Sequence, residues 1–133
     1  MAVIFITGSS TGIGLATAVA FGRARHDVYA TMRNPDRAPE LASIAAKERL
    51  PIKVLPMDVD NDTSVGKAVA GVLAESGRID VLVNNAGIAV TGPVEELPLA
   101  EFRRVMETNY FGALRCIQAV VSWYARAAQR PHH

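Results

Sequence analysis

The sequence predicts an α/β fold based on a doubly wound parallel sheet that stops after the fourth strand and the helix following it. Short apolar runs alternate with longer segments in which apolar residues recur at helical spacing, and this alternation is typical of βαβ units. Hydrophobic residues make up 50% of the 133 residues and charged residues 20%. This composition favours one globular domain with a hydrophobic core.

The first half of the chain contains three apolar runs, each compatible with a strand. The first strand is expected at residues 3–7, directly before a glycine-rich segment, and a helix at 12–24 directly after it. The second and third strands are expected at residues 27–32 and 52–57, with a helix at residues 39–50 between them.

A third helix is expected at residues 62–76, with Asn61 or Asp62 as its N-cap. Its apolar residues recur every three or four positions, which places them on one buried face: Val65, Val69, Val72 and Leu73. The fourth strand follows at residues 80–84.

The last expected element is a long helix at residues 99–127, after a turn at Gly92 and Pro93. Its expected apolar side consists of Phe102, Val105, Met106, Tyr110 and Leu114. The chain contains no internal repeat and no low-complexity linker.

Charge and cysteine content argue against several classes of protein. A formal net charge of +1 without a basic run gives no general attraction for nucleic acid or an anionic membrane. No apolar stretch reaches the ~20 residues that a membrane span needs. The single cysteine, Cys116, excludes an internal disulfide and a cysteine-based metal site, and His132 and His133 alone do not make one. We therefore expect a cytoplasmic protein without a metal, in which Cys116 is buried.

The segment between the first strand and the first helix has the features of a nucleotide phosphate site. Gly8 allows a tight exit from the strand, Gly12 allows close approach of a pyrophosphate, and Gly14 allows close packing of the helix. The N–H groups and positive dipole end of the helix would face the phosphates. A glycine cluster alone also occurs in surface turns, but the flanking strand and helix favour a site. The expected phosphate-binding residues, including three with hydroxyl donors, are Gly8, Ser9, Ser10, Thr11, Gly12, Ile13 and Gly14.

The end of the second strand bears on the choice of dinucleotide. NAD-specific domains usually place an acidic residue there, but this chain has Arg33. A guanidinium can pair with a 2′-phosphate, so NADP is favoured over NAD. Alternatively Arg33 is a solvated loop residue and Asp27 or Asp36 matters instead, although one precedes the strand and the other follows Pro35.

Two further motifs complete a pattern. The stretch Asn84, Asn85, Ala86 and Gly87 closes the fourth strand, and Asn109 lies in the last helix. With the Thr-Gly-x-x-x-Gly-x-Gly spacing of the first motif, the chain resembles the N-terminal half of the classical short-chain dehydrogenase/reductase family. The resemblance implies a Rossmann-type sheet with strand order 3-2-1-4. It also implies an oxidoreductase that transfers hydride between NADP(H) and a small-molecule carbonyl or secondary alcohol.

The resemblance also implies roles for single residues. Asp58 would hydrogen-bond the adenine amino group, and the backbone of Val59 would contact the ring. The alternative for Asp58 is a cap of the next helix, where Asp60, Asn61 and Asp62 are also available.

Beside the adenosine ribose, the resemblance places Asn85, Ala86 and Gly87, and it implies that the amide of Asn84 ties neighbouring strands together. The alternative is an ordinary turn. Asn109 matches the asparagine of the family's catalytic tetrad, which interrupts regular helix bonding and holds a water connected to the active-site lysine. Set among apolar residues, it needs hydrogen-bond partners.

The family's catalytic serine and Tyr-x-x-x-Lys pair have no counterpart in this sequence. Ser122 and Tyr124 are assigned no role, because Ala128 stands where the lysine would follow Tyr124. The chain alone is therefore expected to be inactive. Two alternatives are a catalytically silent dinucleotide-binding module and a nonfunctional truncated product.

The tail divides the chain into a half-domain at residues 1–120 and an atypical segment at residues 121–133. If the reading frame of the gene is shifted by one base, the shifted triplet across the codons of Trp123 and Tyr124 can only encode glycine. Permitted codons then allow Pro-Gly-Met-Arg-Ala-Arg-Arg-Ser-Gly-Arg-Ile, the continuation expected from the family. We therefore hypothesise a frameshifted or truncated product. The fourth strand would then be an open edge, which favours marginal stability or a homo-oligomer.

Substrate identity depends largely on residues that this sequence lacks, leaving only residues 88–97 as a candidate pocket wall. The sequence at residues 29–34 resembles the branch that handles hydroxysteroids and retinoids.

Overall fold

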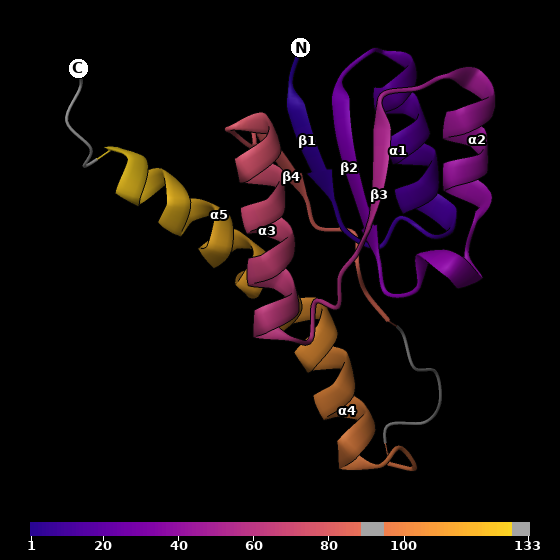
Figure 1. Cartoon of the computed structure of the whole chain (residues 1–133). Coiled ribbons are helices and arrows are strands. Elements are labelled where there is room, and N and C mark those ends of the chain that lie inside the picture. The colour runs from indigo at the N-terminus through magenta and orange to yellow at the C-terminus, as the bar shows by residue number, and fades with distance from the viewer. Residues whose placement is uncertain (89–94, 129–133) are drawn as a thin grey trace.

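The computed structural model describes residues 1–88 and 95–128, so the expected turn at Gly92 and Pro93 and the terminal histidines lie outside the described residues. A sheet of four parallel strands forms its centre, in the order β3-β2-β1-β4 (Figure 1). The strands are β1 (Val3–Ile6), β2 (Asp27–Met32), β3 (Ile52–Pro56) and β4 (Val81–Val83). The predicted parallel fold class and strand order are confirmed.

Helices cover both faces of this sheet, as a doubly wound fold requires. The two helices α1 (Gly12–Arg23) and α2 (Glu40–Glu48) lie on one face, and α3 (Asp62–Ser76) and α5 (Gly112–Ala128) on the other (Figure 1). The expected helix at residues 39–50 is shorter than predicted. A separate 3₁₀ turn, η1 (Pro35–Arg37), comes before it.

Alternate residues of β1 enter different cores, because successive side chains of a strand point to opposite faces. Ile4 and Ile6 pack with residues of α1 and α2, whereas Val3 and Phe5 pack with residues of α3 and α5. All four side chains are buried. The continuous apolar run in the sequence thus reflects a strand that is covered on both faces.

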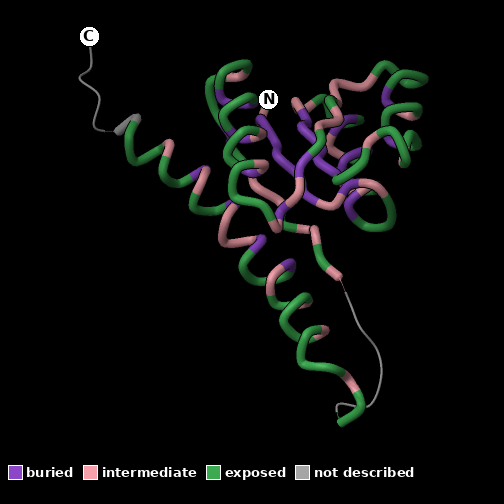
Figure 2. The backbone as a smooth tube through the Cα atoms, turned by 60° about the horizontal axis from the view of Figure 1, so that its bottom comes forward, coloured by how far each residue is buried: buried purple, intermediate pink, exposed green. Residues whose placement is uncertain are grey.

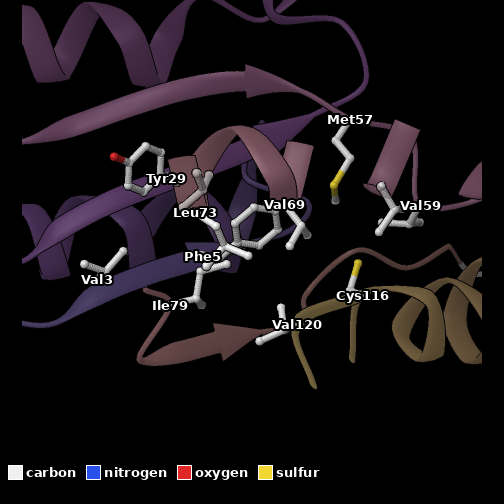
Figure 3. Packing of buried hydrophobic residues seen from close by; sticks show 12 residues of the cluster. Val3, Phe5, Tyr29, Met57, Val59, Val69, Leu73, Ile79, Cys116 and Val120 are labelled. Atoms are coloured by element: carbon white, nitrogen blue, oxygen red, sulfur yellow. The ribbon is translucent and has the colours of Figure 1, made fainter. Parts of the chain in front are cut away.

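Three sequence predictions are confirmed in α3 and in the core beneath α3 and α5 (Figure 3). The four predicted residues of α3 are all buried, and Asn61 is the N-cap, its Oδ1 accepting a hydrogen bond from Ser64 N at 2.9 Å. Cys116 from α5 is fully buried in the same core. Burial raises the pKa of the Cys116 thiol to about 11, which keeps the side chain neutral.

The long last helix differs from the prediction in two ways. A π-helical segment, η2 (Glu107–Phe111), separates α4 (Leu99–Met106) from α5. Three of the five residues predicted on the apolar side of this helix, Phe102, Met106 and Tyr110, are exposed, while Thr108, Gly112 and Cys116 are buried. The reason is geometric: a π segment adds a residue to the turn and changes the face that follows, and α4 itself projects away from the sheet (Figures 1 and 2).

Strand β4 pairs with β1 alone among the described strands, and Val81 is 39% exposed. The expected edge position of the fourth strand is therefore observed. Within residues 1–88 and 95–128, no helix has the combination of length and apolar character needed to cross a membrane.

Candidate cofactor site at the carboxyl edge of the sheet

A cavity of about 390 Å³ lies where the parallel strands end. Predicted residues that follow each of the four strands line it: Gly8 and Ser10 after β1, Arg33 after β2, Asp58 and Val59 after β3, and Ala86 and Gly87 after β4. Ligands of open α/β folds bind at this edge. The structure thus brings together segments that are up to 79 positions apart in the chain.

The glycines of the first motif have the conformations that their predicted roles need. Gly8 has φ +65° and Gly12 has φ +59°, values that other residues rarely adopt. A Cβ on Gly8 would lie 2.7 Å from Ala86 Cα, whereas one on Gly12 would meet nothing within 4 Å. The loop therefore passes close to the segment after β4 while Gly12 leaves open space in front of α1.

Gly14 makes the tightest approach in the site. A Cβ there would lie 2.1 Å from Gly8 O and 2.5 Å from Asn85 Nδ2. The first turn of α1 is therefore pressed against its own loop and the segment after β4, which confirms the close packing expected at this glycine.

The start of α1 fits a phosphate group. Thr11 is the N-cap but makes no side-chain hydrogen bond to the helix, and Thr11, Gly12 and Ile13 are exposed. N–H groups of a first helical turn have no partner within the helix, so an anion can accept from them. One expectation for this loop is wrong: the Ser9 hydroxyl is fully buried and donates to Ile6 O at 3.4 Å, so it cannot face a ligand.

Thr7 organises the segment after β4. Its buried Oγ1 accepts hydrogen bonds from Asn85 N at 3.0 Å and Ala86 N at 2.9 Å. The amide of Asn85 donates from Nδ2 to Gly8 O at 2.9 Å. Asn85, and not Asn84 as expected, therefore ties the two loops together, since Asn84 is exposed at the end of β4.

Arg33 and Asp58 meet across the cavity mouth. Arg33 Nη2 lies 3.2 Å from Asp58 Oδ2 and 3.5 Å from Asp60 Oδ2. Asp58 also accepts from Asp60 N at 2.9 Å, and it does not cap α3, because Asn61 does. Partial burial raises the pKa of Asp58, but the Asp60 N–H and the Arg33 charge outweigh it, so the pKa lies below its ordinary value.

The alternatives to Arg33 are not placed to replace it. Asp27 is the first residue of β2 and so lies at the other end of the strand. Asp36, in η1, is not among the residues that line the cavity.

Several cavity residues were not predicted as site residues, among them Arg37, Asp60, Arg104 and Thr108. Asp60 Oδ2 accepts a hydrogen bond from Thr108 Oγ1 at 3.0 Å, which links the end of β3 to η2. Its Oδ1 is buried and has no partner among the described residues. Of these four residues, Arg37 could have been found from the sequence, because it is a basic residue shortly after the second strand. The others could not, because the approach of α4 and η2 depends on tertiary packing.

Asn109 lies in the π segment, as an interruption of regular helix bonding requires. Its Oδ1 accepts from Ile88 N at 2.8 Å and its Nδ2 donates to Ile88 O at 2.9 Å. The expectation that Asn109 is set among apolar side chains is wrong, because Asn109 is exposed. Its amide nevertheless makes hydrogen bonds to two backbone groups, as predicted. It holds the loop after β4 against η2.

The tail tyrosine is remote from the cavity. The Tyr124 hydroxyl donates to Ile79 O and accepts from Ile79 N at 3.2 Å. Ile79 precedes β4, at the amino end of the strands. Trp123 packs beside the core, and α5 continues through residue 120 without a break.

Known proteins resemble the chain over almost its whole length. It is 40% identical over 131 residues to Retinol dehydrogenase 8 from Bos taurus, covering 95% of this chain and 41% of that protein. It is 38% identical to 3-ketodihydrosphingosine reductase from Bacteroides thetaiotaomicron, covering 96% and 44%. The structure of NADPH-bound carbonyl reductase from chicken fatty liver superposes with a TM-score of 0.83 at 31% identity, covering 96% and 49%.

The chain thus spans less than half the length of each of these relatives. The profile of the family described as short chain dehydrogenase matches residues 2–129. Together with the parallel sheet and the site at its carboxyl edge, this match shows that the chain belongs to the short-chain dehydrogenase family of oxidoreductases.

Proposed function

We propose that this chain binds NADP(H) as the N-terminal half of a short-chain dehydrogenase/reductase. The observation that carries the proposal is the cavity, which collects the glycine loop, Arg33, Asp58 and the segment after β4 at one edge of the sheet. Support for NADP over NAD comes from Arg33, which stands at the end of β2 without a carboxylate at that position of the strand.

The residues would divide the binding as follows. The N–H groups at the start of α1, with Ser10 and Thr11, would hold the pyrophosphate. Asp58 and the backbone of Val59 would face the adenine, and Asn85, Ala86 and Gly87 would lie beside its ribose. The open space at Gly12 leaves room for a ligand.

When bound, NADP(H) supplies the hydride chemistry of the family. This chain contributes Asn109, which would act as a positioning residue by holding Ile88 against η2. The sequence contains no Tyr-x-x-x-Lys motif, so we expect the 133 residues alone to bind the dinucleotide without turnover. Turnover is not expected because, without this motif, the 133 residues lack the tyrosine that would donate a proton to the carbonyl oxygen.

Titration of the chain with NADPH and NADH, followed by calorimetry, tests this function. We expect saturable binding of both, with NADPH tighter, and no oxidation of NADPH by a ketone or aldehyde. Ser10→Trp should abolish binding of both, because Ser10 lines the cavity. The matched variant Ser43→Trp, exposed on α2, should bind as the wild type does. Absence of NADPH binding by the folded wild-type chain would refute the proposal.

The substrate of the complete protein would be a small carbonyl compound or secondary alcohol. A 40% identical relative named for retinol favours a hydrophobic alcohol. Most of the expected pocket wall, residues 89–94, lies outside the described residues. Assays with retinoid and hydroxysteroid alcohols would need a chain that also contains the Tyr-x-x-x-Lys motif.

The second candidate function is a binding module that never turns over. Gene sequence beyond the codon for Val121 separates the two. A shifted frame that restores a serine and Tyr-x-x-x-Lys would favour an interrupted dehydrogenase, and its absence would favour the module.

Marginal stability or a homo-oligomer is expected for the chain, and the cytoplasm is its expected compartment. Exposed apolar side chains on α4, η2 and α5 support self-association: Leu99, Phe102, Met106, Tyr110, Phe111, Ile117 and Val121. Sedimentation velocity across a range of concentrations tests this, and a monomer throughout would contradict it.

A further inference from the structure

Arg115, in α5, is not among the residues that line the cavity, but it binds three segments around it. Its Nη1 donates to Val59 O at 3.1 Å, and its Nε donates to Asp62 Oδ1 at 2.5 Å. Its Nη2 donates to Glu107 Oε1. One guanidinium thus joins α5 to the segment after β3, to the first residue of α3 and to the first residue of η2.

The Arg115 side chain is more enclosed than its two acidic partners. It is 21% exposed, against 85% for Asp62 and 42% for Glu107. Ion pairs with exposed carboxylates add little stability, because water screens them. They do fix the direction of a planar guanidinium, whose donors point along set lines. The carboxylates therefore orient Arg115, and its bond to Val59 O transmits that orientation to the segment after β3.

A second contact holds Val59 against the same helix. Val59 is buried in the core beneath α3 and α5, together with Cys116 (Figure 3). A Cβ on Gly112, the first residue of α5, would lie 2.9 Å from Val59 Cγ2 and 3.3 Å from Val59 O. The side chain and the carbonyl of Val59 are therefore both fixed by α5.

The position of Val59 in turn determines where Asp58 lies. Residues 58–61 form a turn, in which Asn61 N donates to Asp58 O at 3.1 Å and Asp60 N donates to Asp58 Oδ1 at 2.9 Å. Asp58, Val59 and Asp60 all line the cavity. A shift of the Val59 carbonyl would therefore move the whole turn, and with it the carboxylate that would face the adenine.

We infer that Arg115 is a positioning residue of the cofactor site, which holds the Val59 carbonyl so that the turn presents Asp58 to the adenine amino group. Arg115 acts through Val59 and Asp58 and does not itself touch the dinucleotide. The inference rests on the proposed function, since it names the residue that aligns one part of the same site.

Binding of NADPH and of its deamino analogue tests this role by calorimetry. The analogue has an oxo group in place of the adenine amino group, so it cannot donate that hydrogen bond to Asp58. We expect the wild type to bind NADPH at least about tenfold more tightly than the analogue. Asp58→Ala should remove this preference.

Arg115→Lys keeps the positive charge but has one ammonium where three nitrogens act in a fork. It cannot bind Val59 O and both carboxylates in the same geometry. We expect the preference for NADPH over the analogue to fall at least about fivefold. The matched control is Arg126→Lys, exposed on α5, which should keep the wild-type preference. A merely structural role would weaken both ligands by one factor and leave their ratio unchanged.

Glu107→Ala gives the same readout from a more exposed position, and it serves if Arg115→Lys does not fold in thermal melting. It leaves Arg115 in place but removes one carboxylate that orients the guanidinium. We expect the preference to fall about threefold. Glu48→Ala is its control, because it removes an exposed ion pair with Arg23 that joins α1 to α2. This control should not change the preference.

The outcomes separate this inference from the function on which it rests. If the folded wild type binds neither NADPH nor the analogue, the proposed function fails. If the wild type prefers NADPH and the folded Arg115 and Glu107 variants keep the same ratio, the function stands and the positioning role of Arg115 is overturned. Equal binding of the two ligands by the wild type would also overturn that role.

Discussion

Gly14→Ala is expected to destabilise the chain and to disable its cofactor site. The added methyl would lie 2.1 Å from Gly8 O, 2.5 Å from Asn85 Nδ2 and 2.9 Å from Gly8 C. Two of these three contacts are with backbone atoms, so rotation of a side chain cannot relieve them. The first turn of α1 must therefore move away from the loop.

The size of the effect follows from three contributions. Overpacking of this kind raises the free energy of the native state by about 1–3 kcal/mol. Displacement of Asn85 breaks its 2.9 Å hydrogen bond to Gly8 O, a loss of about 1 kcal/mol. Alanine returns up to about 1 kcal/mol through its higher helix propensity. The net loss is about 1–4 kcal/mol, or roughly 4 °C of Tm for each kcal/mol.

Thermal and urea unfolding of Gly14→Ala, with Gly66→Ala as the matched control, measures this loss. Gly66 lies within α3, and a Cβ there would meet nothing within 4 Å. The control should therefore gain about 0.5–1 kcal/mol. If Gly14→Ala melted at the wild-type temperature and bound NADPH normally, the close contact of α1 with the loop would be refuted.

Three further predictions concern side chains outside the glycine loop. Thr7→Val leaves two backbone N–H groups without their acceptor and should destabilise the chain by about 2 kcal/mol in urea unfolding, whereas Thr17→Val should change stability by less than about 0.5 kcal/mol, because the Thr17 hydroxyl donates only to Ile13 O of its own helix. The pKa of Asp80 is lowered, first by a hydrogen bond from the first residue of β1 and then by the charge of a neighbouring arginine, so its contribution to stability is present at neutral pH and is lost as pH falls below the ordinary value of 3.8. Asp80→Asn should accordingly show a shallower loss of stability under acid than the wild type or Asp36→Asn, and parallel curves for all three would contradict this. Cys116, buried and with its pKa raised to about 11, should react with a thiol reagent at pH 8 only after unfolding, and fast labelling of the native chain would show that the core beneath α5 is open.

Much of the fold could be predicted because its signals are local. The strands of a sheet covered on both faces read as unbroken apolar runs, and α3 shows its buried face in the spacing from Val65 to Leu73. The glycine loop was equally readable, since Gly8 and Gly12 occupy backbone conformations that few other residues adopt. Sequence alone therefore determined the fold class, the order of the elements and the edge of the sheet where the site lies.

Other features depended on contacts between distant segments, which no local pattern records. Asn84 and Asn85 are adjacent and chemically identical, and only the approach of Gly8 decided that Asn85 makes the bridge. Side chains expected inside the last helix are exposed because α4 projects away from the sheet and the π segment around Asn109 changes the face that follows it.

The electrostatics of the cavity were also decided by tertiary structure. The pairing of Arg33 with Asp58 and Asp60 arises because parallel strands end at one edge, so that Arg33 Nη2 lies 3.2 Å from Asp58 Oδ2 and 3.5 Å from Asp60 Oδ2. Thr108 reaches Asp60 only because η2 packs against the end of β3. Residue types and their spacing thus predicted where a dinucleotide would bind, and packing alone decided which charges at that place are already paired.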